Sequence, residues 1–302
     1  MIGIDIGGAN IKIVTGDEVV IRYCPLWEKA PLGDILSEFD DDAAVVMSGE
    51  LADCFNNKTE GIRFIVDAVR GALPKAQFYG TDAAFHTEAV LDLAAANWLA
   101  SADLLKDRYQ DALLLDLGST TADIIPLQPF RELRGQTDLS RLRAGYLVYC
   151  GMLRTPVSSL VRSACINWYD TPLSTEYFAS AGDAHLVLGH ITPGEYTVAT
   201  PDGKEVNREM SLRRLGRMAC ADLDEIGEEG AVAIAEAFWD AQKAIIGDAV
   251  ARTGRETILA AGIGADLIHT TFGGINLNRE LGRFADALPA YAVREVAIRD
   301  GI

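Results

Sequence analysis

The sequence predicts an α/β protein made of two related halves, each a mixed sheet flanked by helices, around a central cleft. Two observations carry this prediction. Short apolar runs typical of buried strands alternate with longer stretches of helical periodicity. In addition, a strand–turn–strand motif led by an aspartate occurs twice, first at Asp5 and again at Asp116. The repeat divides the chain into residues 1–111 and 112–302, each half with its own copy of the motif.

The second copy, LLLDLGSTTADIIPL at residues 113–127, has the composition of a phosphate cradle. Between its two apolar strands lie a glycine, three hydroxyl residues and a second acid: Gly118, Ser119, Thr120, Thr121 and Asp123. Glycine allows close approach of the backbone, and the turn offers N–H groups and hydroxyls to phosphate oxygens. The flanking acids suit a divalent cation such as Mg²⁺, which would offset the phosphate charge. Taken alone, this stretch is explained equally well by an ordinary hairpin with a polar turn.

The first copy opens the chain as MIGIDIGGANIKIV, with Gly7 and Gly8 in the turn. Alternation along the following strand puts Asn10 and Lys12 on one face, toward the turn. The chain has only seven lysines, so a lysine beside a glycine turn is informative.

A third run of small residues, at 258–265, contains Gly262 and Gly264. Single glycine turns are common, whereas two acid-led hairpins followed by a late glycine run form a specific pattern. This trio resembles the actin-like ATPase superfamily of sugar kinases, Hsp70 and actin. There, two duplicated hairpins hold phosphate and the late glycine turn holds adenosine.

Five segments resemble one branch more closely, the archaeal condensing enzymes of methanofuran biosynthesis. They are residues 48–55, 95–102, 116–127, 137–142 and 147–157. The resemblance implies a transferase that joins an (aminomethyl)furanylmethyl diphosphate to γ-glutamyltyramine, with Mg²⁺ as cofactor and diphosphate as a product. If the late glycine turn, which lacks the paired glycines common in adenosine turns, reflects a changed ligand, the furan or tyramine portion would occupy the former adenosine pocket.

The motifs and the resemblance together assign roles. Asp5, Asp116 and Asp123 are the expected metal-side acids, and Lys12 is the expected charge partner of the diphosphate. Glu50 follows the predicted strand 43–47, where α/β sheets place ligand sites, and is the expected base. The expected phosphate ligand Arg154 lies on the loop after the predicted strand 146–150; a salt bridge to one of the many acids is the alternative.

Two other functional classes stay open. An ATP-dependent kinase or a hydantoinase/oxoprolinase-like enzyme of the same superfamily would use the same acids and hairpins. The glycine turn, AGIGA at 261–265, lacks the paired glycines common in adenosine turns, a small departure that does not exclude adenine. A non-catalytic nucleotide switch is the second alternative.

The composition of the chain limits the classes of partner that it is expected to bind. The chain of 302 residues is 49% hydrophobic and carries a net charge of −17, which argues against nucleic acid and anionic membranes as partners. Five cysteines without a CxxC pair indicate reduced thiols and no structural zinc, and Asp5 interrupts any leader-like apolar run, so a cytoplasmic location is expected. His185 and His190 are expected to be structural.

Four local predictions concern secondary structure. A helix is expected at residues 60–73 with Thr59 as its N-cap, and a helical pattern runs from 88 to 109 with a break near Asn97 or Ser101. Residues 222–230 are expected to form an acidic solvated linker, and residues 292–298 a final strand.

Overall fold

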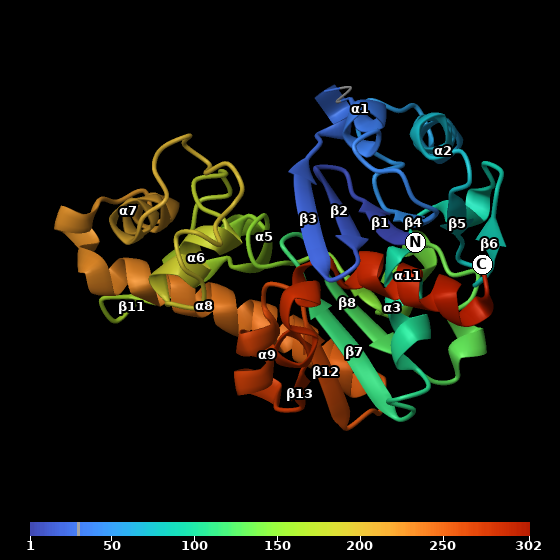
Figure 1. Cartoon of the computed structure of the whole chain (residues 1–302). Coiled ribbons are helices and arrows are strands. Elements are labelled where there is room, and N and C mark those ends of the chain that lie inside the picture. The colour runs from blue at the N-terminus through green and yellow to red at the C-terminus, as the bar shows by residue number, and fades with distance from the viewer. Residues whose placement is uncertain (29–30) are drawn as a thin grey trace. The chain divides into compact units, whose positions relative to one another are not determined.

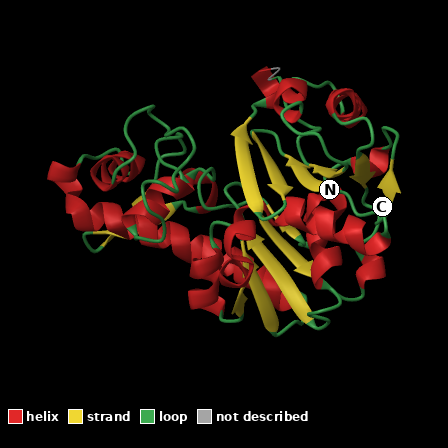
Figure 2. Cartoon of the chain, viewed as in Figure 1, coloured by secondary structure: helices red, strands yellow, loops and turns green. Residues whose placement is uncertain are grey.

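The computed structural model describes residues 1–28 and 31–302 and confirms the α/β class, with mixed sheets flanked by helices (Figures 1 and 2). The chain forms two compact units that are interleaved along the sequence. Unit 1 comprises Met1–Leu114, Ile125–Ala144 and Leu277–Ile302, and unit 2 comprises Leu115–Ile124 and Gly145–Asn276. The division into halves after residue 111 stays a prediction based on the repeated motif.

Unit 1 is organised around a six-stranded sheet of order β3-β2-β1-β4-β5-β6. Its strands are β1 (Ile2–Ile6), β2 (Asn10–Thr15), β3 (Glu18–Tyr23), β4 (Ala43–Met47), β5 (Gln77–Tyr79) and β6 (Phe85–His86). β1 pairs antiparallel with β2 and parallel with β4, so the sheet is mixed. All five residues of β1 and of β4 are buried, as expected for central strands covered on both faces.

Helices lie on both faces of this sheet, as Figure 1 shows. The helical elements of unit 1 are η1 (Leu26–Glu28), α1 (Leu32–Leu36), α2 (Lys58–Ala72), η2 (Leu91–Leu93), α3 (Asn97–Leu105), η3 (Phe130–Glu132), α4 (Asp138–Ala144), α10 (Leu277–Leu281), η4 (Gly282–Ala287) and α11 (Leu288–Asp300). Ile4 and Ile6 join the core cluster that includes Ile62 and Ile65 of α2. On the other face, a Cβ at Gly3 would collide with the Ala290 carbonyl, so glycine allows α11 to pack directly on β1.

The expected final strand at 292–298 is wrong, because these residues belong to α11. Val293, Val296 and Ala297 are fully buried at helical spacing, whereas Arg294 and Glu295 between them are only partly buried. The β-branched residues made the segment look like a strand. Packing of one helical face against β1 and β4 overrides that weak local preference.

Two helix starts in unit 1 differ from expectation. α2 begins at Lys58, and its N-cap is Asn57 rather than Thr59: the Asn57 side chain accepts a hydrogen bond from the Glu60 N–H at 3.0 Å. The pattern at 88–109 forms η2 and α3, and the expected break lies before Asn97, at Ala95, whose φ of +48° no helix accommodates.

Unit 2 contains the second hairpin and the late glycine turn. The second sheet has the order β13-β12-β7-β8-β9. The strands that follow β6 are β7 (Ala112–Leu117), β8 (Ala122–Pro126), β9 (Leu147–Val148), β10 (Ser163–Ile166), β11 (Tyr169–Pro172), β12 (Thr257–Ala261) and β13 (Ile275–Asn276). The helices are α5 (Val157–Leu160), α6 (Ala181–Val187), α7 (Arg208–Met218), α8 (Leu223–Arg252) and α9 (Ala265–Phe272).

The acidic stretch at 222–230 is not a linker but the start of α8. Asp222 caps this helix by accepting hydrogen bonds from the N–H groups of Asp224 and Glu225. Negative side chains in the first turn are favoured there by the helix dipole. Gly227, with φ +70°, marks a kink at which two helical segments join.

Within the described residues, no helix is long and apolar enough to span a membrane.

Candidate functional site

The two hairpin turns share one local geometry. In the first, the Gly7 N–H donates to the Asn10 carbonyl at 3.0 Å; in the second, the Gly118 N–H donates to the Thr121 carbonyl at 2.9 Å. Both turns therefore have the same length and the same closing hydrogen bond. The repeat seen in the sequence is a repeat of backbone structure.

Asp5 of β1 is the most perturbed group of the first hairpin. Its side chain is only 7% exposed, and its Oδ1 has no hydrogen-bond partner among residues 1–28 and 31–302. Burial raises the pKa of Asp5 to about 6, and the positive charge of Lys12 opposes that rise. A buried carboxylate oxygen without a donor is a group that a cation would satisfy.

β4 delivers Glu50 next to the backbone of the first turn. The N–H groups of Ser48 and Gly49 both donate to the Ile6 carbonyl, at 2.9 and 3.1 Å. A Cβ at Gly49 would lie only 2.8 Å from the Gly7 carbonyl oxygen, so glycine is required for this close approach. The segment after β4 is thus fixed against the end of β1, as the strand-end argument predicts.

Glu50 itself is 2% exposed, and its Oε2 has no hydrogen-bond partner within the described chain. Lys58 Nζ lies 3.9 Å from Glu50 Oε1. Burial raises the pKa of Glu50, the Asp138 charge adds to the rise, and Lys58 lowers it. A carboxylate held in this way accepts a proton more readily than an exposed one.

In unit 2, the loop after β9 clamps the second hairpin. The Met152 N–H donates to the Gly118 carbonyl, and the N–H groups of Leu153 and Arg154 both donate to the Ser119 carbonyl, at 2.9 to 3.0 Å. The predicted ligand Arg154 is therefore anchored at the hairpin by its backbone, and its side chain is exposed.

The late glycine turn lies against the second hairpin. The Gly264 N–H donates to the Leu117 carbonyl at 2.9 Å, and a Cβ at Gly262 would collide with Asp116 Oδ1. Gly262 also has φ +78°, which favours glycine. The structure therefore brings Asp116, the hydroxyl turn and the glycine turn together within unit 2.

A hydrogen-bonded chain behind this loop was not predicted. Gln242 Nε2 donates to the Gly151 carbonyl at 3.0 Å, and Gln242 Oε1 lies 2.8 Å from His185 Nε2. His185 Nδ1 in turn lies 2.9 Å from His190 Nδ1. Burial lowers the pKa of His185 to about 3, so the ring is neutral, and the two histidines support the loop at Gly151.

The expected Mg²⁺ fits Asp5 through its buried Oδ1, which no described residue satisfies. Across residues 1–28 and 31–302, no three His, Cys, Asp or Glu side chains gather into a metal site. Mg²⁺ does not need such a group, because it commonly binds one or two carboxylates together with substrate phosphates and water. Asp116 and Asp123 flank the second hairpin and stay predicted ligands.

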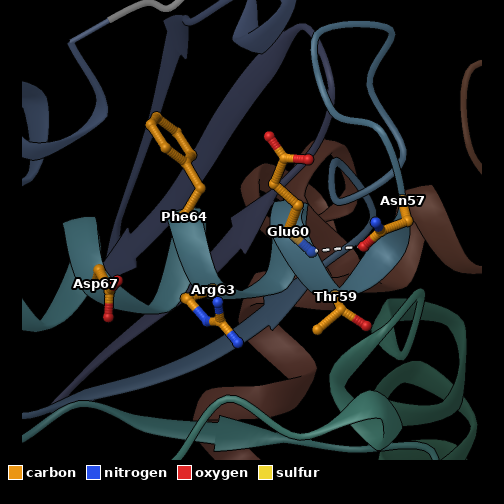
Figure 3. Close-up of a pocket in the computed structure, with 6 residues that line it drawn as sticks. All are labelled: Asn57, Thr59, Glu60, Arg63, Phe64 and Asp67. Atoms are coloured by element: carbon orange, nitrogen blue, oxygen red, sulfur yellow. Dashed lines mark hydrogen bonds between the residues drawn. The ribbon is translucent and has the colours of Figure 1, made fainter.

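The structure also has an open hollow of about 650 Å³ along α2, shown in Figure 3. It is lined by Asn57, Thr59, Glu60, Arg63, Phe64 and Asp67. None of the predicted site residues lines it. Asp5 and Glu50, which each have a buried oxygen without a hydrogen-bond partner in the described chain, indicate the candidate site better than this hollow does.

Comparison with solved structures finds two distant likenesses. A nucleotide-free acetone carboxylase matches with a TM-score of 0.43 and 12% identity over 91% of this chain, which spans half the length of that protein. A ROK family glucokinase from Streptomyces griseus, in complex with glucose and AMPPNP, matches with a TM-score of 0.47 and 13% identity over 99% of both chains.

Sequence relatives are much closer. A (4-{4-[2-(gamma-L-glutamylamino)ethyl]phenoxymethyl}furan-2-yl)methanamine synthase from Methanocaldococcus jannaschii is 35% identical over 98% of this chain and 97% of that protein. A protein of the same name from Methanococcus vannielii is 34% identical over 57% of this chain and 79% of its own length. The hydantoinase/oxoprolinase family model matches residues 41–274. The chain therefore belongs to the hydantoinase/oxoprolinase family.

Proposed function

We propose that the chain condenses an (aminomethyl)furanylmethyl diphosphate with γ-glutamyltyramine to form an aryl ether and diphosphate, a step of methanofuran biosynthesis. One observation carries the proposal: the 35% identity, over nearly the full length of both chains, to a synthase of that ether. The name of that relative describes a phenoxymethyl link between a γ-glutamylaminoethyl phenol and a furan.

The reaction breaks the bond between the furan methylene and the diphosphate oxygen, and the electron pair leaves with diphosphate. Electron donation from the furan stabilises the positive charge that develops on the methylene carbon. The phenol oxygen then bonds to that carbon and gives up its proton. Donors placed where charge develops on the leaving diphosphate lower the barrier, and one such donor contributes roughly 3 kcal/mol in comparable sites.

Within this proposal, Lys12 neutralises diphosphate charge and Asn10 binds a diphosphate oxygen, while Gly7 and Gly8 allow the backbone of the first turn to approach the ligand closely. In unit 2 the corresponding groups are the hydroxyl turn after Gly118, the glycine turn and Arg154. Mg²⁺ would be held by Asp5 in unit 1 and would supply further charge neutralisation when bound, and Asp116 and Asp123 stay the predicted acids of unit 2. The unpartnered Oδ1 of Asp5 supports this assignment.

Glu50 is the proposed base for the phenol. A phenol has a pKa near 10 in water, so it requires only partial deprotonation as the new bond forms. Two features support Glu50 as the base. The pKa of its carboxyl is raised toward the pKa of the phenol, and its Oε2 has no hydrogen-bond partner in the described chain.

The proposal is tested by incubating the purified protein with both substrates and Mg²⁺. We expect the ether, identified by mass, and diphosphate in equal amounts, with no requirement for ATP. Formation of ADP or phosphate with a requirement for ATP would support the kinase or oxoprolinase-like alternatives and overturn the proposal. Activity that survives exhaustive EDTA treatment would remove Mg²⁺ from it.

A further inference from the structure

The buried polar side-chain atoms of unit 1 without a hydrogen-bond partner in the described chain include, besides Asp5 Oδ1, the three atoms Glu50 Oε2, Trp98 Nε1 and Gln136 Oε1. The side chains of Glu50 and Trp98 are 2% and 5% exposed. Buried polar atoms are nearly always hydrogen-bonded. Three buried atoms in one unit that lack hydrogen-bond partners therefore suggest that a bound ligand supplies those partners.

Glu50 and Trp98 belong to one neighbourhood. The backbone of Ala95, three residues before Trp98, acts on the Glu50 carboxyl and lowers its pKa. On the other side, the guanidinium of Arg141 lies over the Trp98 ring, 4.1 Å from its centroid, and its Nη1 lies 3.3 Å from Asp138 Oδ1.

The start of α4 extends this neighbourhood. The Asp138 charge acts on Glu50, and Gln136 lies two residues before Asp138, the first residue of α4. Gln136 is anchored by its Nε2, which donates to the Glu132 carbonyl at 2.7 Å and leaves Oε1 unmatched.

The backbone around Trp98 is held in an unusual conformation. Ala95 has φ +48°, a region that a non-glycine residue seldom occupies and that is enriched at functional sites. α3 begins two residues later, with Trp98 in its first turn. The Arg141 guanidinium on the ring face holds the indole in place and is itself only 2% exposed.

The hydrogen-bonding character of these three atoms also limits the chemistry of the ligand. An indole N–H only donates, a carboxylate oxygen accepts, and an amide oxygen accepts. A hydroxyl satisfies the first two at once, since its oxygen accepts from Trp98 while its proton is donated to Glu50. The amide oxygen of Gln136 then requires an N–H elsewhere on the same molecule.

We infer that Glu50, Trp98 and Gln136 form the subsite for the hydroxylated acceptor, with Trp98 Nε1–H donating to the acceptor oxygen. This inference rests on the proposed function and deepens it, because γ-glutamyltyramine carries both a phenol and an amide N–H. Trp98 is then a catalytic residue. As the phenolic proton passes to Glu50, the indole N–H stabilises the growing negative charge on the oxygen that attacks the methylene carbon.

The test uses tyramine as a probe, with phenethylamine, which lacks the hydroxyl, as its matched partner. Calorimetric titration of the full chain should show tyramine binding at least tenfold more tightly than phenethylamine. In Trp98→Phe, which keeps an aromatic ring under Arg141, this preference should fall about tenfold, in keeping with one lost hydrogen bond. Trp168→Phe, at a side chain 96% exposed, should leave it unchanged.

A second variant covers the case in which Trp98→Phe does not fold. Gln136→Met, at a half-buried position, should weaken γ-glutamyltyramine binding while leaving the tyramine preference intact. The inference is overturned if wild type binds both probes equally, or if folded Trp98→Phe keeps the full preference. It is also overturned if Gln136→Met binds γ-glutamyltyramine normally.

The two proposals fail separately. Wild-type ether formation combined with an unchanged probe preference in Trp98→Phe would reject only the subsite. Absence of ether formation would reject the proposed function, whatever the probes do.

Discussion

Asp5 and Lys12 are direct partners across the first hairpin: their Cα atoms are paired in the antiparallel register of β1 and β2. Side chains opposite one another in such a pair share one face of the sheet. The Lys12 charge therefore acts on Asp5, but burial outweighs it, and the carboxyl keeps a raised pKa. The hairpin thus presents a cation beside a buried acid that still has an unused oxygen.

The first prediction is that Lys12→Ala loses most activity and keeps its fold. Removal of one preorganised charge-neutralising group costs about 10²- to 10³-fold in kcat in comparable sites. The measurement is diphosphate release under saturating substrates, with circular dichroism as the folding check. Lys75→Ala is the control, because its side chain is 83% exposed and its Nζ lies 3.7 Å from exposed Asp42. Equal rates in both variants would return Lys12 to the role of an ordinary strand residue.

The second prediction concerns Asp5 and pH. Because the folded-state pKa of about 6 lies above the ordinary 3.8, the folded state binds the proton more tightly than the unfolded state. The Asp5 contribution is therefore most favourable below pH 3.8, and the free energy of unfolding falls as pH rises through 6. The loss amounts to roughly 3 kcal/mol in the absence of a cation.

Asp5→Asn should remove this dependence, so its stability relative to wild type should increase between pH 4 and pH 8. Urea unfolding at both pH values measures the difference, with Asp17→Asn in the exposed β2–β3 turn as the control. Mg²⁺ should stabilise wild type more at pH 8 than at pH 5 and should not stabilise Asp5→Asn. Equal Mg²⁺ effects in the two proteins would argue against Asp5 as a ligand.

The hairpins could be predicted from the sequence because each is local. An acid, a glycine turn and two apolar strands occur within a dozen residues, and the closing bonds of Gly7 and Gly118 follow from that spacing. The α11 segment could not, since its helix is selected by packing on β1, including the close approach at Gly3. Its local composition favours a strand instead.

The site divides in the same way. The role of Glu50 as a ligand residue stays a prediction, but its position just after β4 was predictable because an apolar strand precedes it. The unmatched atoms of Trp98 and Gln136 were not, since only the fold determines which polar groups become buried without partners. Trp98 in sequence resembles an ordinary core residue. The Gln242–His185 chain likewise links residues 57 positions apart.

The third prediction separates two effects of a glycine. Gly262 and Gly203 both have positive φ, at +78° and +67°, but only at Gly262 would a Cβ collide with Asp116 and Leu117. Gly203→Ala should therefore cost about 1 kcal/mol or slightly more from backbone strain alone. Gly262→Ala should cost clearly more and should also impair turnover, because the second hairpin must shift. Equal costs, measured by urea unfolding, would show that the contact at Asp116 relaxes freely.

The last prediction concerns His185, whose folded-state pKa of about 3 lies below the ordinary 6.5. The unfolded chain then binds the proton more tightly than the folded chain. Stability from this group is fully present above pH 6.5 and declines as pH falls toward 3, by up to roughly 5 kcal/mol.

His185→Gln should be destabilised at pH 7, by roughly 1–3 kcal/mol, because it disturbs the hydrogen bonds to Gln242 and His190. Its deficit should shrink as the pH is lowered to 4.5, since the variant has no imidazole to protonate at this position. His269→Gln on α9, whose ring Nδ1 lies 2.9 Å from the Gly274 carbonyl oxygen, is the matched control. Unfolding free energies at the two pH values provide the comparison. A deficit that stays constant with pH would mean that His185 is not held neutral, and would remove the basis for its role in supporting the loop at Gly151.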